Sequence, residues 1–149
     1  MPRTKTAQAD ISEVDYILEE QVGFLLRQVN QRHAVIFAEI INDSLTPTQF
    51  AVLAKLKELQ VCSQNELGRL TAMDAATVKG VVERLKGRSL VRTVPDKNDR
   101  RRLSVELTKK GEKVAAEAVS RGNSISDETL GALTASERKS LLRLLNKLK

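Results

Sequence analysis

The stretch DKNDRRRLSVELTKKG, residues 96–111, places three consecutive arginines between a turn and a β-prone segment. The letters DKND are typical of a turn, and RLSVEL then alternates apolar with polar residues, as half-buried strands do. The preceding letters LVRTV also favour a strand. The sequence therefore predicts a two-stranded hairpin whose tip carries Arg100, Arg101 and Arg102.

Two helices are predicted immediately before this hairpin. SQNELGRLT indicates a short helix that Ser63 and Glu66 begin as a capping box, in which each side chain bonds the other residue's backbone N–H. DAATVKGVVERLKG indicates an amphipathic helix capped by Asp74. A short helix, a tight connection and an amphipathic helix form a helix-turn-helix pattern. With a basic hairpin directly after it, the pattern predicts a winged helix-turn-helix.

A long helix and a shorter one are predicted before this unit. Apolar residues recur at helical spacing from residue 11 to residue 41, which predicts one long amphipathic helix with a bend at Gly23. A second helix is expected from Pro47 to Leu59, where Thr46 and Gln49 form a capping box. A helix as long as the first has more to cover than a small domain offers, so a partner subunit is expected.

The C-terminal part predicts two more helices. Thr108 is expected to cap a long helix that Gly122 interrupts. Thr134 and Glu137 then form a further capping box, which opens a last helix over ASERKSLLRLLNKLK. The fold class is therefore mainly α with a small β-hairpin wing.

Positive charge is concentrated in one segment. Residues 84 to 113 contain eleven Lys or Arg and four acidic residues. The segment has a net charge of +7, and the whole chain has a net charge of +6. Such a segment indicates a polyanionic partner, nucleic acid before an anionic membrane. Aromatic residues make up 3% of the chain and none lies in this segment. Because unpaired bases are bound by stacking on aromatic side chains, duplex DNA is expected rather than single strands.

The remaining composition argues against other classes of protein. Cys62 is the single cysteine, which excludes an internal disulfide and fits the reducing cytoplasm. No apolar run reaches membrane-spanning length, and the opening residues lack a signal-peptide core. The sequence holds no metal-ligand cluster, phosphate-binding glycine loop or nucleophile–base pair, so we expect no enzyme activity, no metal and no cofactor.

Ten residues are expected to contact DNA. In a winged helix-turn-helix the amphipathic helix enters the major groove, and the hairpin reaches the minor groove or phosphates. Arg101 is expected to enter the minor groove with its guanidinium oriented by Asp99, while Arg100 and Arg102 contact phosphates or pair with acids. The other expected contacts are Ser63, Gln64, Thr77, Lys79, Arg84 and Lys86. The alternative interpretations are a solvated turn, an exposed helix face and a simple helix cap.

These expectations divide the chain into parts. Residues 1–10 are expected to be a polar tail, and residues 11–149 a single winged helix-turn-helix domain. Within that domain, residues 11–45 and 109–149 form dimerisation helices, and residues 46–108 form a DNA-binding lobe.

The chain resembles the MarR family of bacterial transcription regulators in LTPTQFAVL, SQNELGRLT, ATVKGVVERLKGRSLV, the DRR of residues 99–101 and the VELTKKG of residues 105–111. The resemblance covers nearly the whole chain. It implies a homodimer whose first, fifth and sixth helices interdigitate, two winged lobes that bind a palindrome, and repression relieved by a small aromatic ligand. Gly80 departs from the family pattern, since many relatives carry an arginine there, and Lys79 and Thr77 are expected to take over base contacts.

The resemblance also implies an effector pocket between the dimer helices and the lobe. In relatives that sense aromatic acids, an arginine on the first helix binds the ligand carboxylate, and Arg27 is expected to do so as a bidentate clamp. The further pocket residues expected are Asn30, His33, Phe37, Gln49 and Phe50. The alternatives are a partner-subunit salt bridge for Arg27, a surface histidine for His33 and core packing for the phenylalanines.

The segments VGFLLRQVNQRHAVIFAEI and QNELGRLTAMDAATVKGVV resemble the branch of the family that represses nicotinate breakdown. This resemblance implies a hydroxylated pyridine carboxylate, such as 6-hydroxynicotinate, as the effector. Two other functions stay open. One is an oxidant-sensing repressor that uses Cys62, and the other is a DNA-architectural protein of low sequence selectivity.

Overall fold

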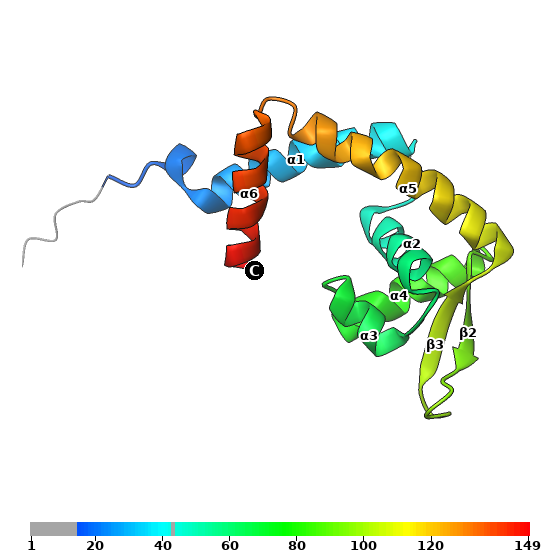
Figure 1. Cartoon of the computed structure of the whole chain (residues 1–149). Coiled ribbons are helices and arrows are strands. Elements are labelled where there is room, and N and C mark those ends of the chain that lie inside the picture. The colour runs from blue at the N-terminus through cyan, green and yellow to red at the C-terminus, as the bar shows by residue number, and fades with distance from the viewer. Residues whose placement is uncertain (1–14, 43) are drawn as a thin grey trace, which may run out of the picture.

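The computed structural model describes residues 15–42 and 44–149, so the polar tail expected in residues 1–10 lies outside the described residues. The described chain is mainly α-helical with one small sheet, as predicted (Figure 1). In chain order the elements are η1 (Leu18–Glu20), α1 (Val22–Ile41), α2 (Pro47–Leu59), β1 (Val61–Ser63), α3 (Gln64–Leu70), α4 (Ala75–Gly87), β2 (Val91–Pro95), β3 (Leu103–Leu107), α5 (Lys109–Thr129) and α6 (Ala135–Leu148).

Side-chain caps begin five of the helices where the sequence places them. Each cap accepts a hydrogen bond from a backbone N–H of the first turn, which otherwise has no partner inside the helix. The boxes of α2 and α6 are complete, because their Gln and Glu side chains also bond the cap's own N–H. The five caps are Thr46 for α2, Ser63 for α3, Asp74 for α4, Thr108 for α5 and Thr134 for α6.

The helix expected over residues 11–41 is shorter than predicted. Ile17 and Gln21 have extended backbone angles on either side of the short turn η1, so α1 begins only at Val22. Gln21 makes no side-chain capping bond, and apolar spacing alone does not fix where a helix starts. The helix passes Gly23 without interruption, and residues 11–14 lie outside the described residues.

The interruption expected at Gly122 is wrong, because α5 runs unbroken from Lys109 to Thr129. The structure gives the glycine another role. A Cβ atom at position 122 would lie 3.2 Å from Cζ of Phe50 on α2. Glycine therefore permits α2 to pack closely on α5, and it does not end the helix.

The sheet has three antiparallel strands, one more than the predicted hairpin. β2 and β3 form the hairpin, and β1 pairs with the other edge of β3. β1 has only three residues, too few for an alternating pattern to show in the sequence. It places Ser63, the cap of α3, opposite Ser104, which lies near the tip end of β3.

One hydrophobic core joins the lobe to the long helices. Val52, Leu53 and Leu56 of α2 are fully buried at its centre. Phe37 and Ile41 extend the core into the second half of α1. The remaining buried members include Leu67 of α3, Val82 and Leu85 of α4, Val105 of β3 and Ala115 of α5. The lobe is therefore attached through α2 to both α1 and α5.

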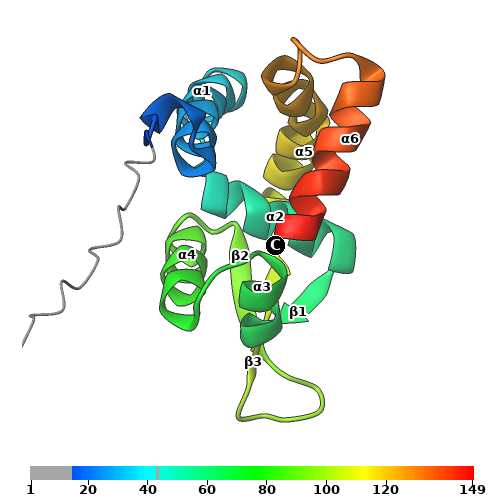
Figure 2. The ribbon, with the colours of Figure 1, turned by 90° about the vertical axis from the view of Figure 1, so that its left-hand side faces the viewer.

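The two ends of the molecule have different architectures. α1 and α5 pack together at one end, and the wing formed by β2 and β3 projects from the other (Figures 1 and 2). Arg32 of α1 ties down the end of α5, since its guanidinium donates to the carbonyl of Thr129 at 2.6 Å and that of Glu128 at 2.9 Å.

Two helices expose apolar side chains that the described part of the chain leaves uncovered. Figure 2 shows α1 and α6 standing apart, and an ion pair between Arg138 and Asp127 fixes α6 to α5. No helix among the described residues is long and apolar enough to cross a bilayer. The exposed large apolar residues are Val22, Leu25, Leu26, Val29 and Val35 on α1 and Leu142, Leu144, Leu145 and Leu148 on α6.

Candidate nucleic-acid interface

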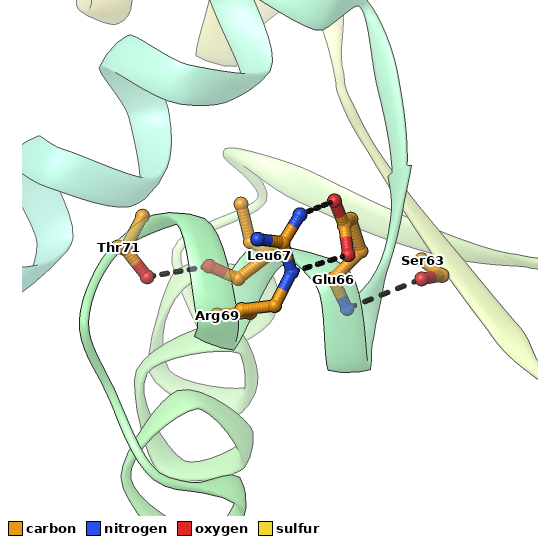
Figure 3. Close-up of polar contacts among 5 residues, drawn as sticks. All are labelled: Ser63, Glu66, Leu67, Arg69 and Thr71. Atoms are coloured by element: carbon orange, nitrogen blue, oxygen red, sulfur yellow. Dashed lines mark hydrogen bonds and ion pairs between the residues drawn. The ribbon is translucent and has the colours of Figure 1, made fainter.

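The connection between α3 and α4 is tight and strained. A Cβ at Gly68 would meet the carbonyl oxygen of Met73 and Cγ1 of Val78 at 3.1 Å, so glycine allows the two helices to approach. The N–H of Met73 donates to the carbonyl of Gly68 at 2.8 Å, and the Thr71 hydroxyl donates to that of Leu67 at 2.6 Å (Figure 3). Ala72 turns the chain with a φ of 55°, a left-handed conformation that glycine adopts more easily.

The capping box expected at the start of α3 forms only in half. The Ser63 hydroxyl accepts from the Glu66 N–H at 3.2 Å, but the Glu66 carboxylate pairs with Arg69 (Figure 3). Arg69 stands one turn further along the helix, and its guanidinium lowers the pKa of Glu66. A charged partner on the same helix face thus draws the carboxylate away from the Ser63 N–H.

The exposed face of α4 carries the side chains expected to contact DNA. Val78, Val81, Val82 and Leu85 are buried, and the expected contacts are all exposed. At about 100° per residue, Thr77 and Arg84 lie along one side of the exposed face, and Lys79 and Lys86 along the other. Gly80 and Glu83 lie between these sides, and Lys86 approaches Glu83 at 3.7 Å. The helix therefore presents two basic edges with little side-chain bulk at Gly80 between them.

Asp96 organises the turn at the wing tip, a role that sequence reasoning missed. One carboxylate oxygen accepts from the backbone N–H groups of Asn98 at 2.8 Å and Asp99 at 3.2 Å, and the other accepts from the Ser104 hydroxyl at 3.1 Å. The two backbone bonds are the main reason that the pKa of Asp96 is lowered. The signal in the sequence was an aspartate at the first position of the turn, which commonly bonds backbone groups two and three residues on.

Asp99 was expected to orient the guanidinium of Arg101, but its carboxylate contacts other groups. Its carboxylate accepts from the backbone N–H of Arg101 at 3.0 Å, and it lies 3.8 Å from Nε of Arg102. The turn between Asp99 and Arg102 explains why the Asp99 carboxylate lies near Arg102, because the Arg102 N–H donates to the Asp99 carbonyl and brings the two residues close together. Asp99 thus fixes the backbone at Arg101, whose side chain is exposed together with that of Arg100.

A hollow of about 210 Å³ lies between the start of α3 and the wing. Ser63, Gln64 and Asn65 line one side, and Arg101 and Arg102 line the other. The structure therefore brings together two groups of expected contacts that are almost 40 residues apart in the chain. Two guanidinium groups beside a helix start form a surface that suits a phosphate of the DNA backbone.

The residues expected to bind an effector fall into two groups. Phe37 and Phe50 pack edge to face with ring centres 5.6 Å apart. The buried amide oxygen of Gln49 accepts from the Thr46 N–H at 3.3 Å. Arg27 and Asn30 are instead exposed on α1, in the half of that helix that also exposes apolar residues.

His33 lies between these groups and is half-buried. Its Nδ1 is 2.8 Å from the hydroxyl of Thr129, and that hydroxyl donates its single hydrogen to the Ile125 carbonyl at 2.7 Å. The hydroxyl can therefore only accept from His33, so Nδ1 carries the proton. This arrangement leaves Nε2 of the neutral ring as an acceptor.

Cys62 is buried in β1, at 7% exposure. Burial is the main reason that the pKa of its thiol is raised, and the nearby Glu66 raises it further. Because oxidants react with the thiolate, both effects lower its reactivity. Among the described residues, no cluster of three His, Cys, Asp or Glu side chains is arranged to hold a metal ion.

Comparison with known proteins identifies similar transcriptional regulators. Residues 45–103 match the model of the MarR family. The chain is 42% identical over 147 residues to the HTH-type transcriptional repressor NicR of Pseudomonas putida, covering 98% of this chain and 93% of NicR.

Two solved structures share the fold closely. One is BpsR of Bordetella bronchiseptica, whose DNA binding is regulated by 6-hydroxynicotinic acid, at 43% identity and a TM-score of 0.85 over 89% of this chain and 96% of BpsR. The other is a MarR variant from Escherichia coli complexed with operator DNA, at 27% identity and a TM-score of 0.78 over 85% of this chain and 91% of that one.

Proposed function

We propose that this chain, which belongs to the MarR family of transcriptional regulators and is not an enzyme, is a homodimeric repressor that binds palindromic duplex DNA. We further propose that a small aromatic acid releases it from the DNA. A regulator of chromosomal DNA works in the cytoplasm, which is where we place this protein.

The observation that carries the DNA-binding proposal is the arrangement of α3, α4 and the wing. The exposed basic edges of α4 suit base edges and phosphates in the major groove. The hollow lined by Ser63, Gln64, Arg101 and Arg102 suits a backbone phosphate beside that groove. The turn fixed by Asp96 presents Arg101 to the adjacent minor groove, where arginine is favoured electrostatically.

The exposed apolar faces of α1 and α6 support the dimer. Nine large apolar side chains are exposed on these two helices, and eight of them lie in the first half of α1 and the second half of α6. Isolated soluble domains rarely leave such patches uncovered. A second copy would supply the same two faces in exchange, which is how a two-fold interface forms. A dimer also provides two α4 helices, as a palindrome requires.

The effector proposal rests on α1 and on the BpsR relative. Arg27 would bind a carboxylate, and Nε2 of His33 would accept a hydrogen bond from a ring hydroxyl or ring N–H. BpsR is regulated by 6-hydroxynicotinic acid, a pyridine ring with both kinds of group. We therefore propose a hydroxypyridine carboxylate as the effector. It would be bound by Arg27, Asn30, His33, Phe37, Gln49 and Phe50.

The proposed mechanism is a change in spacing between the two lobes. Two α4 helices must lie about 34 Å apart to enter successive major grooves. An effector between α1, α2 and α5 releases the DNA only if it binds more tightly to a different spacing. Its affinity for free protein must therefore exceed its affinity for the DNA-bound protein.

Fluorescence anisotropy tests the proposed function. The full chain is titrated onto duplex DNA from upstream of its own gene and onto a scrambled duplex at the same salt concentration, with and without 6-hydroxynicotinate, nicotinate and salicylate. Selective binding that 6-hydroxynicotinate reverses supports the proposal, and Arg27→Gln should then need much more of the compound. Equal, weak binding to both duplexes would instead support the DNA-architectural alternative.

The oxidant-sensing alternative has less support from the structure. The Cys62 thiol is buried and its pKa is raised, whereas sensing cysteines are exposed thiolates with lowered pKa values. If Cys62→Ser abolished release by peroxide while 6-hydroxynicotinate had no effect on the wild type, the oxidant sensor would replace our proposal.

A further inference from the structure

Arg88 links the end of α4 to the corner between α1 and α2. It is the C-cap residue of α4. Its Nη1 donates to the Ser44 carbonyl at 2.9 Å and to the Gln49 side-chain oxygen at 3.3 Å. Ser44 lies in the corner that follows α1, and Gln49 lies in the first turn of α2. One side chain thus connects the helix proposed to enter DNA to α2 and to the corner that follows α1, the helix proposed to form the dimer.

The backbone around Arg88 is fixed on its other side by α5. Lys110 donates to the Arg88 carbonyl at 3.1 Å, and the Thr108 hydroxyl donates to the Ser89 carbonyl at 2.6 Å. The Thr108 N–H donates to the Leu90 carbonyl at 3.1 Å. The end of α4 is therefore held to α5 by backbone groups, while its link to the α1–α2 corner passes through the Arg88 side chain.

A cavity of about 260 Å³ lies beside this link. The cavity is bounded by Ile41 and Asn42 of the corner, by Arg88, and by Val114 and Ala118 of α5. Ile41 and Leu45 of the corner are buried in the core, but open space borders the guanidinium, so its position depends on these two bonds. The bonds from Arg88 thus add a directional restraint to the packing of the core.

We propose that Arg88 is a positioning residue that sets the orientation of α4 relative to α1, and through it the half-site spacing that the dimer accepts. Arg88 itself does not contact DNA in this proposal, which rests on the proposed function. The Gln49 oxygen also belongs to the expected effector site. An effector whose hydroxyl or ring N–H donates to the Gln49 oxygen competes with Arg88 for that acceptor, and so loosens the link when it binds.

The test measures half-site spacing rather than affinity alone. The full-length protein first selects a palindrome from random duplex DNA, and duplexes are then made with one or two base pairs added or removed between its half-sites. We expect Arg88→Gln to bind the selected spacing about tenfold more weakly, because bonds to a charged group are lost, and to discriminate less between spacings.

Salt dependence separates positioning from direct contact. Each phosphate contact contributes about 0.9 to the slope of log affinity against log salt, so an arginine present twice in a dimer contributes about 1.8. Arg88→Gln should leave the slope unchanged, and Arg100→Gln should lower it. Lys55→Gln is the matched control, since it removes a charge on α2 that pairs only locally with Glu58, and it should alter neither slope nor spacing.

Three outcomes overturn the inference. The first is an unchanged spacing preference in Arg88→Gln. The second is a salt slope that falls as it does in Arg100→Gln, which would mean that Arg88 contacts a phosphate.

If Arg88→Gln does not fold, Arg88→Lys replaces it, because lysine keeps the charge but lacks the planar fork. Wild-type spacing in that variant also contradicts the inference. Failure of the wild type to select any palindrome is a separate result, which refutes the proposed function and this inference with it.

Discussion

Gly111 tests the contact that joins α4 to α5. It lies in the first turn of α5, and a Cβ built there would be 1.8 Å from the carbonyl oxygen of Leu90. Real Cβ atoms do not approach other atoms closer than 3.0 Å, so Gly111→Ala must open this contact by at least 1.2 Å. The same carbonyl accepts the Thr108 N–H at 3.1 Å, a bond that such a movement breaks.

The size of the effect follows from three contributions. Overpacking against a rigid backbone costs about 1–3 kcal/mol. Loss of the Thr108–Leu90 hydrogen bond costs about 1 kcal/mol. Alanine gains about 1 kcal/mol over glycine inside a helix. We therefore expect Gly111→Ala to lower the free energy of unfolding by about 2 kcal/mol.

Urea unfolding followed by circular dichroism measures this change at one fixed protein concentration, since dimer stability depends on concentration. Gly87→Ala is the matched control, because Gly87 ends α4 and a Cβ there meets nothing within 4 Å. It should be as stable as the wild type or more so. If Gly111→Ala behaved like Gly87→Ala, the close approach of α5 to Leu90 would be refuted.

Three further predictions concern the wing, the turn before α4 and pH. Arg101→Ala should weaken operator binding at least about tenfold and lower the salt slope in anisotropy titrations, because a charge is lost from each wing; unchanged affinity would contradict our account of the hairpin. Ala72→Gly should raise stability by about 1 kcal/mol in thermal unfolding, since glycine adopts the φ of 55° without strain; a lower melting temperature would exclude strain there. The pKa of Asp96 is lowered in the folded protein, so its carboxylate keeps its hydrogen bonds at every pH above its ordinary pKa of about 3.9. These bonds are lost only as pH falls through the lower folded pKa. The order of the wing should therefore stay constant from about pH 8 to pH 5. Hydrogen exchange at the Asn98 amide checks this, and a loss of protection already near neutral pH would contradict it.

Local signals in the sequence predicted local structure correctly. The caps Thr46, Asp74, Thr108 and Thr134 begin their helices as expected, because each bond joins residues only three positions apart. The hairpin was also predicted, since its alternation and turn letters lie within one short segment. The family resemblance is confirmed by the family match and by NicR.

Features that depend on tertiary contacts were missed or misjudged. β1 forms because it pairs with the free edge of β3. Gly122 is needed because Phe50 packs against it. Neither contact can be inferred from the residues next to it in the sequence. Asp99 bonds the backbone of Arg101 and approaches Arg102, because the turn geometry decides which group it meets. Which residues bind the effector stays a prediction, since the half of α1 that carries Arg27 is completed only by a second copy in our proposal.

Hydroxyl-radical footprinting of the full-length protein on its selected palindrome tests the central claim most directly, because it reads contacts along the DNA without assuming which residues make them. The account predicts two symmetric sets of protected sugars centred about one helical turn apart, with protection extending into the minor groove flanking each half-site. In Arg101→Ala the minor-groove protection should be lost while the two centres remain. Continuous protection without two centres, or protection that Arg101→Ala leaves unchanged, would contradict a dimer that binds through α4 and the wing.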